Sequence, residues 1–159
     1  LHAGVPMETV RKVIQEFARV EHRIEYVCEK DGVAYYNDSK GTNPDAAIKG
    51  IQAMNRPTLL IGGGYDKQST YEEWIQAFDG KVRFLVLIGD TKEKIAKAAR
   101  SVGFNDIIMA DNLKEAVQIC HDKANAGDAV LLSPACASWD QFKSYEQRGE
   151  LFKEYVRAL

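Results

Sequence analysis

The chain has 159 residues, 45% of them hydrophobic and 28% charged, with a formal net charge of −2. This composition is typical of one soluble globular domain, and the near-neutral charge argues against nucleic acid or an acidic membrane surface as a partner. No apolar run reaches the roughly 18 residues that a membrane span needs, and no secretory leader is visible, so we expect a cytoplasmic protein without a membrane partner. Three cysteines without C-x-x-C spacing are expected to be free thiols.

The hydrophobic pattern predicts an opening helix, a hairpin, and then helices alternating with short strands. The apolar spacing of residues 1–19 is helical, and Asp31-Gly32 between two strand-like runs indicates a hairpin of residues 24–29 and 33–36. The remaining predicted elements are helix 43–54, strand 58–61, helix 71–78, strand 82–88, helix 91–102, strand 106–109, helix 113–125, strand 129–132 and a helical segment 139–159 with a break near Gly149.

Capping residues mark the expected helix starts. Asn43 suits the N-cap with Pro44 at the first helical position, and Asn112 suits the N-cap of the helix at 113–125. Thr70 with Glu73 forms a capping-box pattern, and Asp90 is the expected cap of the helix at 91–102.

The alternation of elements predicts an α/β fold with a mostly parallel sheet of about six strands, helices on both faces and the hairpin as an antiparallel edge. In such sheets ligands bind outside the carboxyl ends of the strands. Three polar loops leave those ends, at residues 37–42, 62–69 and 133–138. We therefore expect the three loops to open on the same edge of the sheet.

The loop that ends the predicted hairpin carries more functional groups than a turn requires. Its sequence NDSKGTNPD places Asp38, Lys40 and Thr42 before the start of a helix, where anions are favoured. A surface position is the ordinary interpretation of a lysine, but these neighbours favour contact of Lys40 with phosphate or carboxylate.

The other two loops each allow two interpretations. Gly62-Gly63-Gly64 can be a tight turn or a close approach to a ligand, with Lys67 supplying charge, although Lys67 stands where a dinucleotide fingerprint needs its third glycine. The small residues 133–138 can pack on the sheet or leave backbone N–H groups and Ser138 for a carboxylate. No phosphate-loop motif occurs in the sequence.

Other candidate groups are weaker. The three histidines lack metal-ligand spacing, and Cys136, with no histidine after it, is best interpreted as a packed thiol. Asp38 and Asp66 together could hold a metal ion, as acids do in phosphoacceptor receiver domains, and this alternative stays open.

Several strings in the chain resemble the carboxy-terminal domain of the bacterial Mur ligases. The strings are HRIE at 22–25, NDSKGTNPDAA at 37–47, LLIGGGYDK at 59–67 and LLSPACASWDQF at 131–142, followed by Arg148-Gly149. The resemblance covers residues 21–159 in the family's order and implies a Rossmann-like sheet. Residues 1–20 resemble the closing helix of the family's ATPase domain and a linker.

The strings are most similar to the branch of the family that uses D-glutamate. That resemblance implies an ATP-dependent amide ligase of peptidoglycan synthesis, in which D-glutamate attacks the acyl phosphate formed from ATP and UDP-N-acetylmuramoyl-L-alanine. ATP and magnesium would bind mainly in the central domain and the UDP group in the amino-terminal domain, outside these residues. The fragment alone would be inactive, and the enzyme is expected to be a monomer.

The resemblance also implies roles for individual residues. By position, Arg23, Asp38 and Lys40 would meet the nucleotide, with Lys40 as the catalytic residue that reaches the reacting phosphate. The residues that would hold the carboxylates of D-glutamate are Thr42, Lys67, Ser138 and the backbone near Tyr145. Tyr145 stands where the family has phenylalanine and Trp139 where it commonly has leucine. No residue of this chain is implied as a metal ligand.

A free-standing flavodoxin-like or receiver-like regulatory domain is the competing class. A receiver domain should show an acidic pair early in the chain and a phosphoacceptor aspartate after the third strand. The early acidic pair is missing from the expected place.

Overall fold

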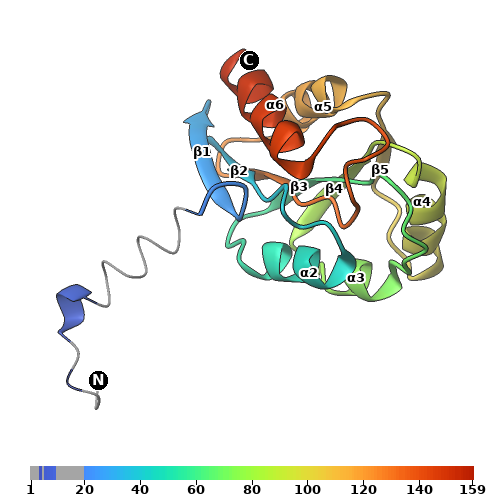
Figure 1. Ribbon diagram of the computed structural model, residues 1–159, viewed down its shortest axis with the longest axis horizontal. Helices are drawn as coiled ribbons and strands as arrows, with labels where there is room; N and C mark the ends of the chain where they lie inside the picture. The colour runs from blue at the N-terminus through green and yellow to red at the C-terminus, as the bar shows by residue number, and fades with distance from the viewer. Residues whose placement is uncertain (1–3, 5, 10–19) are drawn as a thin grey trace.

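The computed structural model describes residues 4, 6–9 and 20–159, so the helix predicted at residues 1–19 falls largely outside the described residues. The hairpin, the alternation of elements and the final helix lie within them (Figure 1). The elements are β1 (Glu25–Lys30), β2 (Val33–Asn37), α2 (Pro44–Gln52), β3 (Thr58–Gly62), α3 (Glu72–Gln76), β4 (Val82–Leu87), α4 (Lys92–Ser101), β5 (Ile107–Met109), α5 (Leu113–Lys123), β6 (Ala129–Leu132) and α6 (Tyr145–Arg157).

Within the described residues, six strands form one sheet in the order β1-β2-β6-β3-β4-β5. The β1–β2 pair is antiparallel, and the other neighbouring pairs are parallel. The turn of the hairpin has positive φ at both Asp31 (53°) and Gly32 (79°), as the Asp-Gly pair predicts. The predicted fold class is confirmed.

Helices cover both faces of the sheet, with α2, α3 and α4 on one face and α5 and α6 on the other (Figure 1). Side chains of β3 alternate between the two cores: Leu60 packs with the first group of helices, and Leu59 and Ile61 pack with the second. All three side chains are fully buried. The central strands are thus buried on both faces, as parallel strands generally are.

Two of the predicted helix caps are confirmed, and the other two, Thr70 and Asp90, are wrong. The side chains of Asn43 and Asn112 cap α2 and α5 by accepting from backbone N–H groups. Helix α3 instead starts after Tyr71, and α4 after Thr91, without a side-chain cap at either residue. The Thr91 hydroxyl lies 3.0 Å from the Gly64 N–H and accepts from it, so a tertiary contact replaces a local cap.

The predicted start of the last helix near residue 139 and its break at Gly149 are also wrong. Helix α6 begins after Ser144, whose hydroxyl caps it by accepting from the Gln147 N–H, and runs through Gly149 to Arg157. A Cβ atom at Gly149 would lie 2.2 Å from Nδ1 of His22. The glycine therefore allows close packing against His22 inside a continuous helix.

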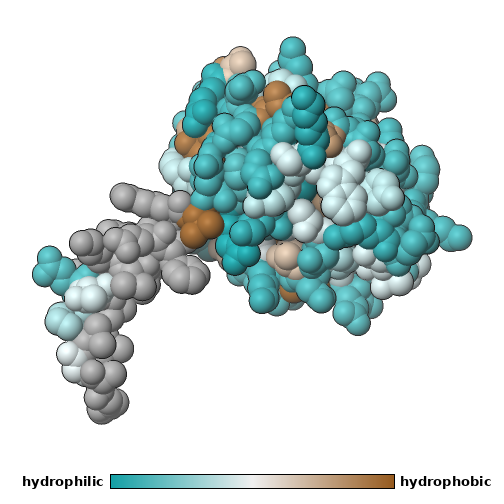
Figure 2. All heavy atoms as spheres, in the orientation of Figure 1, coloured by the Kyte–Doolittle hydropathy of each residue, from teal (hydrophilic) through white to brown (hydrophobic). Residues whose placement is uncertain are grey.

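The face of the molecule shown in Figure 2 is mostly hydrophilic, with hydrophobic residues in small separate groups. The large hydrophobic side chains that are exposed among the described residues are Met7, Val20, Tyr26, Tyr65 and Trp139. No helix in the described ranges has the length and hydrophobicity of a transmembrane segment.

Candidate functional site

The three polar loops meet at one edge of the sheet, as the sequence predicts. The Ala135 N–H donates to the Gly41 carbonyl (2.9 Å), which joins the loop after β6 to the loop after β2. The Gly63 N–H donates to the Pro134 carbonyl, and the Tyr65 N–H to the Ala137 carbonyl, each at 2.9 Å. Backbone hydrogen bonds therefore fix the three loops to one another.

Arg148 of α6 joins the loop after β2 to the loop after β6. Its guanidinium is fully buried and donates to the Ser39 hydroxyl (2.9 Å), the Ser39 carbonyl (2.7 Å) and the Cys136 carbonyl (3.1 Å). Burial lowers the pKa of Arg148 to about 10, which leaves it charged at neutral pH. Apart from the resemblance, nothing in the sequence indicates that this arginine holds the loops.

A cleft of about 420 Å³ opens beside the loop after β2. It brings together the three residues predicted to meet a nucleotide, Arg23, Asp38 and Lys40. The first turn of α2 and Lys49 also line it, so three cationic side chains and a helix N-terminus face one space. The remaining lining residues are Ile24, Gly41, Asn43, Asp45 and Ala46.

Asp38 lines this cleft and is only 4% exposed. One of its carboxylate oxygens accepts from the Ser133 hydroxyl (2.7 Å) and the other from the Ile24 N–H (3.2 Å). Burial raises the pKa of Asp38 to about 6, against the opposing effect of these hydrogen bonds and of two arginines. Asp38 is therefore mainly ionised at neutral pH, and both of its oxygens bind protein groups.

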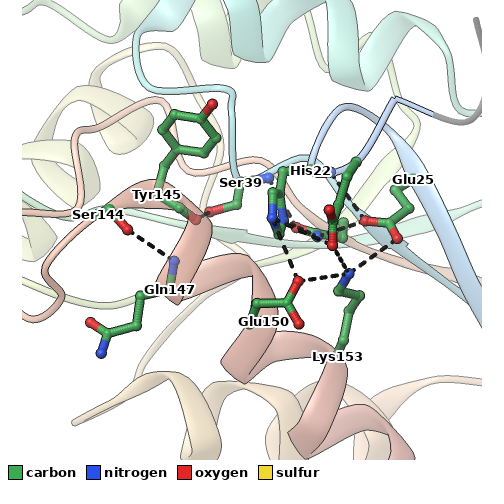
Figure 3. A network of polar contacts seen from close by, with 10 residues as sticks. His22, Glu25, Ser39, Ser144, Tyr145, Gln147, Glu150 and Lys153 are labelled. Atoms are coloured by element: carbon green, nitrogen blue, oxygen red, sulfur yellow. Dashed lines mark hydrogen bonds and ion pairs between the residues drawn. The ribbon is translucent and has the colours of Figure 1, made fainter.

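The residues expected to hold D-glutamate lie on the three loops and at the start of α6. Thr42 is half-buried and Lys67 is exposed, whereas Ser138 is 1% exposed. The Tyr145 carbonyl accepts from the Ser39 hydroxyl (2.7 Å), which ties the start of α6 to the loop after β2 (Figure 3). Among the described residues, no hydrogen bond directly joins Thr42, Lys67 and Ser138.

The structure supports neither a metal ion shared by Asp38 and Asp66 nor a reactive thiol at Cys136. The Asp66 carboxylate accepts from the Gln68 N–H (2.8 Å) and pairs with Lys94 (3.1 Å), while Asp38 is bonded elsewhere, so a metal shared by the two acids is disfavoured. Cys136 is buried, and burial raises the pKa of its thiol. This environment fits the packed thiol that the sequence indicated.

An exposed aromatic pair at the rim of the loops was not predicted as part of the site. Tyr65 and Trp139 are 40% and 63% exposed, and their ring centroids are 5.4 Å apart. The pair lies beside Lys67 and Ser138 in sequence, on the loops that follow β3 and β6. Only the departure of Trp139 from the family's usual leucine could have drawn attention to it.

Residues 22–136 match the family model described as Mur ligase, glutamate ligase domain, and the chain belongs to this family. It is 61% identical over 155 residues to a UDP-N-acetylmuramoylalanine--D-glutamate ligase of Lachnoclostridium phytofermentans, covering 98% of this chain and 34% of that protein. It is 55% identical to the enzyme of the same name from Lachnospira eligens, covering 99% and 35%. The chain thus spans about a third of the length of these relatives.

A solved structure of UDP-N-acetylmuramate-alanine ligase from Thermotoga maritima superposes with a TM-score of 0.65 at 15% identity, covering 98% of this chain and 34% of that one. This likeness confirms the fold. The family match leaves the receiver-like and flavodoxin-like alternative without support.

Proposed function

We propose that this chain is the carboxy-terminal domain of an ATP-dependent amide ligase that adds D-glutamate to UDP-N-acetylmuramoyl-L-alanine in peptidoglycan biosynthesis. The observation that carries the proposal is the meeting of three polar loops at one sheet edge, beside a cleft lined by Arg23, Asp38 and Lys40. The two relatives described above carry the name of this ligase at 61% and 55% identity.

The cleft suits the phosphates of ATP. Arg23, Lys40 and Lys49 supply three positive charges against the two carboxylates of the lining, and the N-terminus of α2 adds its partial positive charge. In the proposal Arg23 and Lys40 contact the nucleotide, and Lys40 also reaches the reacting phosphate. Asp38 acts mainly by fixing the loop, because both of its oxygens accept hydrogen bonds from the protein.

D-glutamate needs donors for two carboxylates from different directions. In the proposal Thr42 and Lys67 bind it from the loops after β2 and β3, and Ser138 and the backbone near Tyr145 bind it from the other side. Since Ser138 is almost fully covered, its hydroxyl requires a small shift of the loop after β6 to reach the ligand. Holding the amine beside the acyl phosphate is catalysis by proximity.

The rest of the enzyme completes the site in this proposal. Glu21, His22 and Glu25 form the sole cluster of three potential metal ligands in the described part of the chain, but the ammonium of Lys153 already bonds both carboxylates. This cluster does not fit magnesium, so we assign magnesium and most ATP contacts to the central domain, which residues 1–20 would join. Closure of the domains would exclude water from the acyl phosphate. The enzyme is proposed to act as a monomer in the cytoplasm.

Release of ADP by the full-length protein tests the proposal. With ATP, magnesium and UDP-N-acetylmuramoyl-L-alanine, we expect ADP release when D-glutamate is added and little when L-glutamate or D-alanine replaces it. The 159-residue chain alone should release none. Turnover with L-glutamate at the same rate as with D-glutamate would contradict the assignment of the substrate.

A further inference from the structure

A strained turn at residues 22–24 sets the position of two cationic residues in the cleft. His22 and Ile24 have positive φ angles of 65° and 45°, and for the β-branched Ile24 such an angle is rare. The His22 carbonyl accepts from the Lys40 N–H (3.0 Å), and Arg23 extends from the middle of the turn into the cleft lining. A backbone of this kind persists only where its surroundings hold it.

The His22 side of the turn is held by a buried polar network (Figure 3). His22 is 5% exposed, and its Nδ1 lies 2.9 Å from the Asn37 amide nitrogen. One oxygen of Glu25 accepts from both the His22 N–H and the Asn37 amide, each at 3.1 Å. Glu25 therefore fixes the turn and the end of β2 together.

Lys153 of α6 fixes Glu25 in turn. Its side chain is 7% exposed, and its ammonium lies 2.8 Å from the carboxylate of Glu21, 3.2 Å from that of Glu25 and 3.0 Å from that of Glu150. Burial by itself lowers the pKa of Lys153, but the bonds to three carboxylates outweigh it and raise the pKa above its ordinary value. The hydrogen bond to Lys153 is the largest of the effects that lower the pKa of Glu21 to about 2.

We propose that Lys153 is a positioning residue for the cleft. From α6 it holds Glu21 and Glu25, and through them the His22 turn, in the conformation that presents Arg23 and Lys40 to a phosphate group. The mechanical part of this inference rests on the contacts alone, whereas the ligand rests on the proposed function. The side chain of Glu25 is 21% exposed and depends most on this ion pair, whereas Glu21 and Glu150 are more than half exposed to water.

Hydrogen exchange of the 159-residue chain tests the mechanical part. Because the Lys40 N–H donates to the His22 carbonyl, its exchange reports opening of the turn. Lys153→Met keeps the aliphatic stem and should speed exchange of this amide by about ten-fold relative to core amides. Lys153→Arg should keep it close to the parent rate.

A matched control comes from the other end of the strands. Arg83→Met removes the ion pair of Arg83 with Asp128, near the starts of β4 and β6, and should leave the relative exchange rate of the Lys40 amide unchanged. If Lys153→Met does not fold, Glu21→Gln serves, because the Glu21 side chain is 59% exposed. An unchanged Lys40 amide in the Lys153 or Glu21 variant, or an equal change in Arg83→Met, overturns the proposal.

Kinetics of the full-length protein test the ligand. Lys153→Met should raise KM for ATP by about five-fold or more, with a smaller effect on KM for D-glutamate, and Lys153→Arg should restore it. Faster Lys40 exchange without a change in KM for ATP would overturn the assignment of this cleft to the nucleotide and leave the contact chain intact. The two failures are therefore distinguishable.

Discussion

Asp38→Asn should make the domain more stable at neutral pH, because it removes a buried negative charge. Burial raises the pKa of Asp38 from 3.8 to about 6. A rise of that size corresponds to about 3 kcal/mol of lost stability when the group is ionised, which we take as the upper bound. Asparagine can still accept from the Ile24 N–H and donate to the Ser133 hydroxyl, so we expect a gain of about 1–3 kcal/mol at pH 7.

The stability difference between Asp38→Asn and the parent should depend on pH. Because the pKa is raised in the folded chain, the contribution of Asp38 to stability is fully present below pH 3.8 and is lost as pH rises through about 6. Urea denaturation of both proteins should therefore show a gap that is smallest at acidic pH, opens across this window and then stays constant.

A second aspartate provides the control for this effect. Asp128→Asn should lower stability at pH 7, since Asp128 is buried and pairs with Arg83. If Asp38→Asn were no more stable than the parent at pH 7, or if the gap did not change with pH, the reasoning would be refuted.

Three further substitutions test other parts of the site. Arg148→Met should cost about 3 kcal/mol or more in urea denaturation, because it strips a buried donor from Ser39 and Cys136; a loss below about 1 kcal/mol would contradict its role. Gly149→Ala should destabilise the domain by about 1–3 kcal/mol, because the new Cβ would lie 2.2 Å from Nδ1 of His22. An NMR spectrum in which the His22 ring resonance does not shift would count against this contact. In the full-length protein, Lys67→Ala should raise KM for D-glutamate about ten-fold with little change in KM for ATP, and equal effects on both would argue against carboxylate binding.

The features predicted correctly are those with short-range signals. Asn43 and Asn112 cap helices through groups three residues away, and Asp31-Gly32 closes a hairpin whose strands are adjacent in sequence. The meeting of the three loops also followed from the sequence, because parallel strands place their carboxyl ends at the same edge. The predicted cap of α4, Asp90, was wrong: the N-cap position is Thr91, and its side chain bonds the distant Gly64 N–H.

The buried charges of α6 could not be predicted from their own segment. Arg148 bonds Ser39 at a separation of 109 residues, and Lys153 bonds Glu21 at a separation of 132. A charged residue on a helix is expected on the solvent-exposed face, because charged side chains are rarely buried unless they are paired. The sequence of α6 alone does not show the partners of Arg148 and Lys153. Only the folded chain shows that they are paired, and that Gly149 between them makes room for His22.

In the proposed function this domain carries part of a D-glutamate site that other domains complete. Titration of the ¹⁵N-labelled 159-residue chain with D-glutamate, followed by NMR, tests location and affinity at once. We expect chemical-shift changes at the amides of Thr42, Lys67, Ser138 and Tyr145. The affinity should be millimolar or weaker, because the free energy of a few exposed contacts only slightly exceeds the entropic cost of immobilising a small ligand. Micromolar binding, or shifts confined to a different surface such as the groove between Leu113 and Tyr155, would contradict the account.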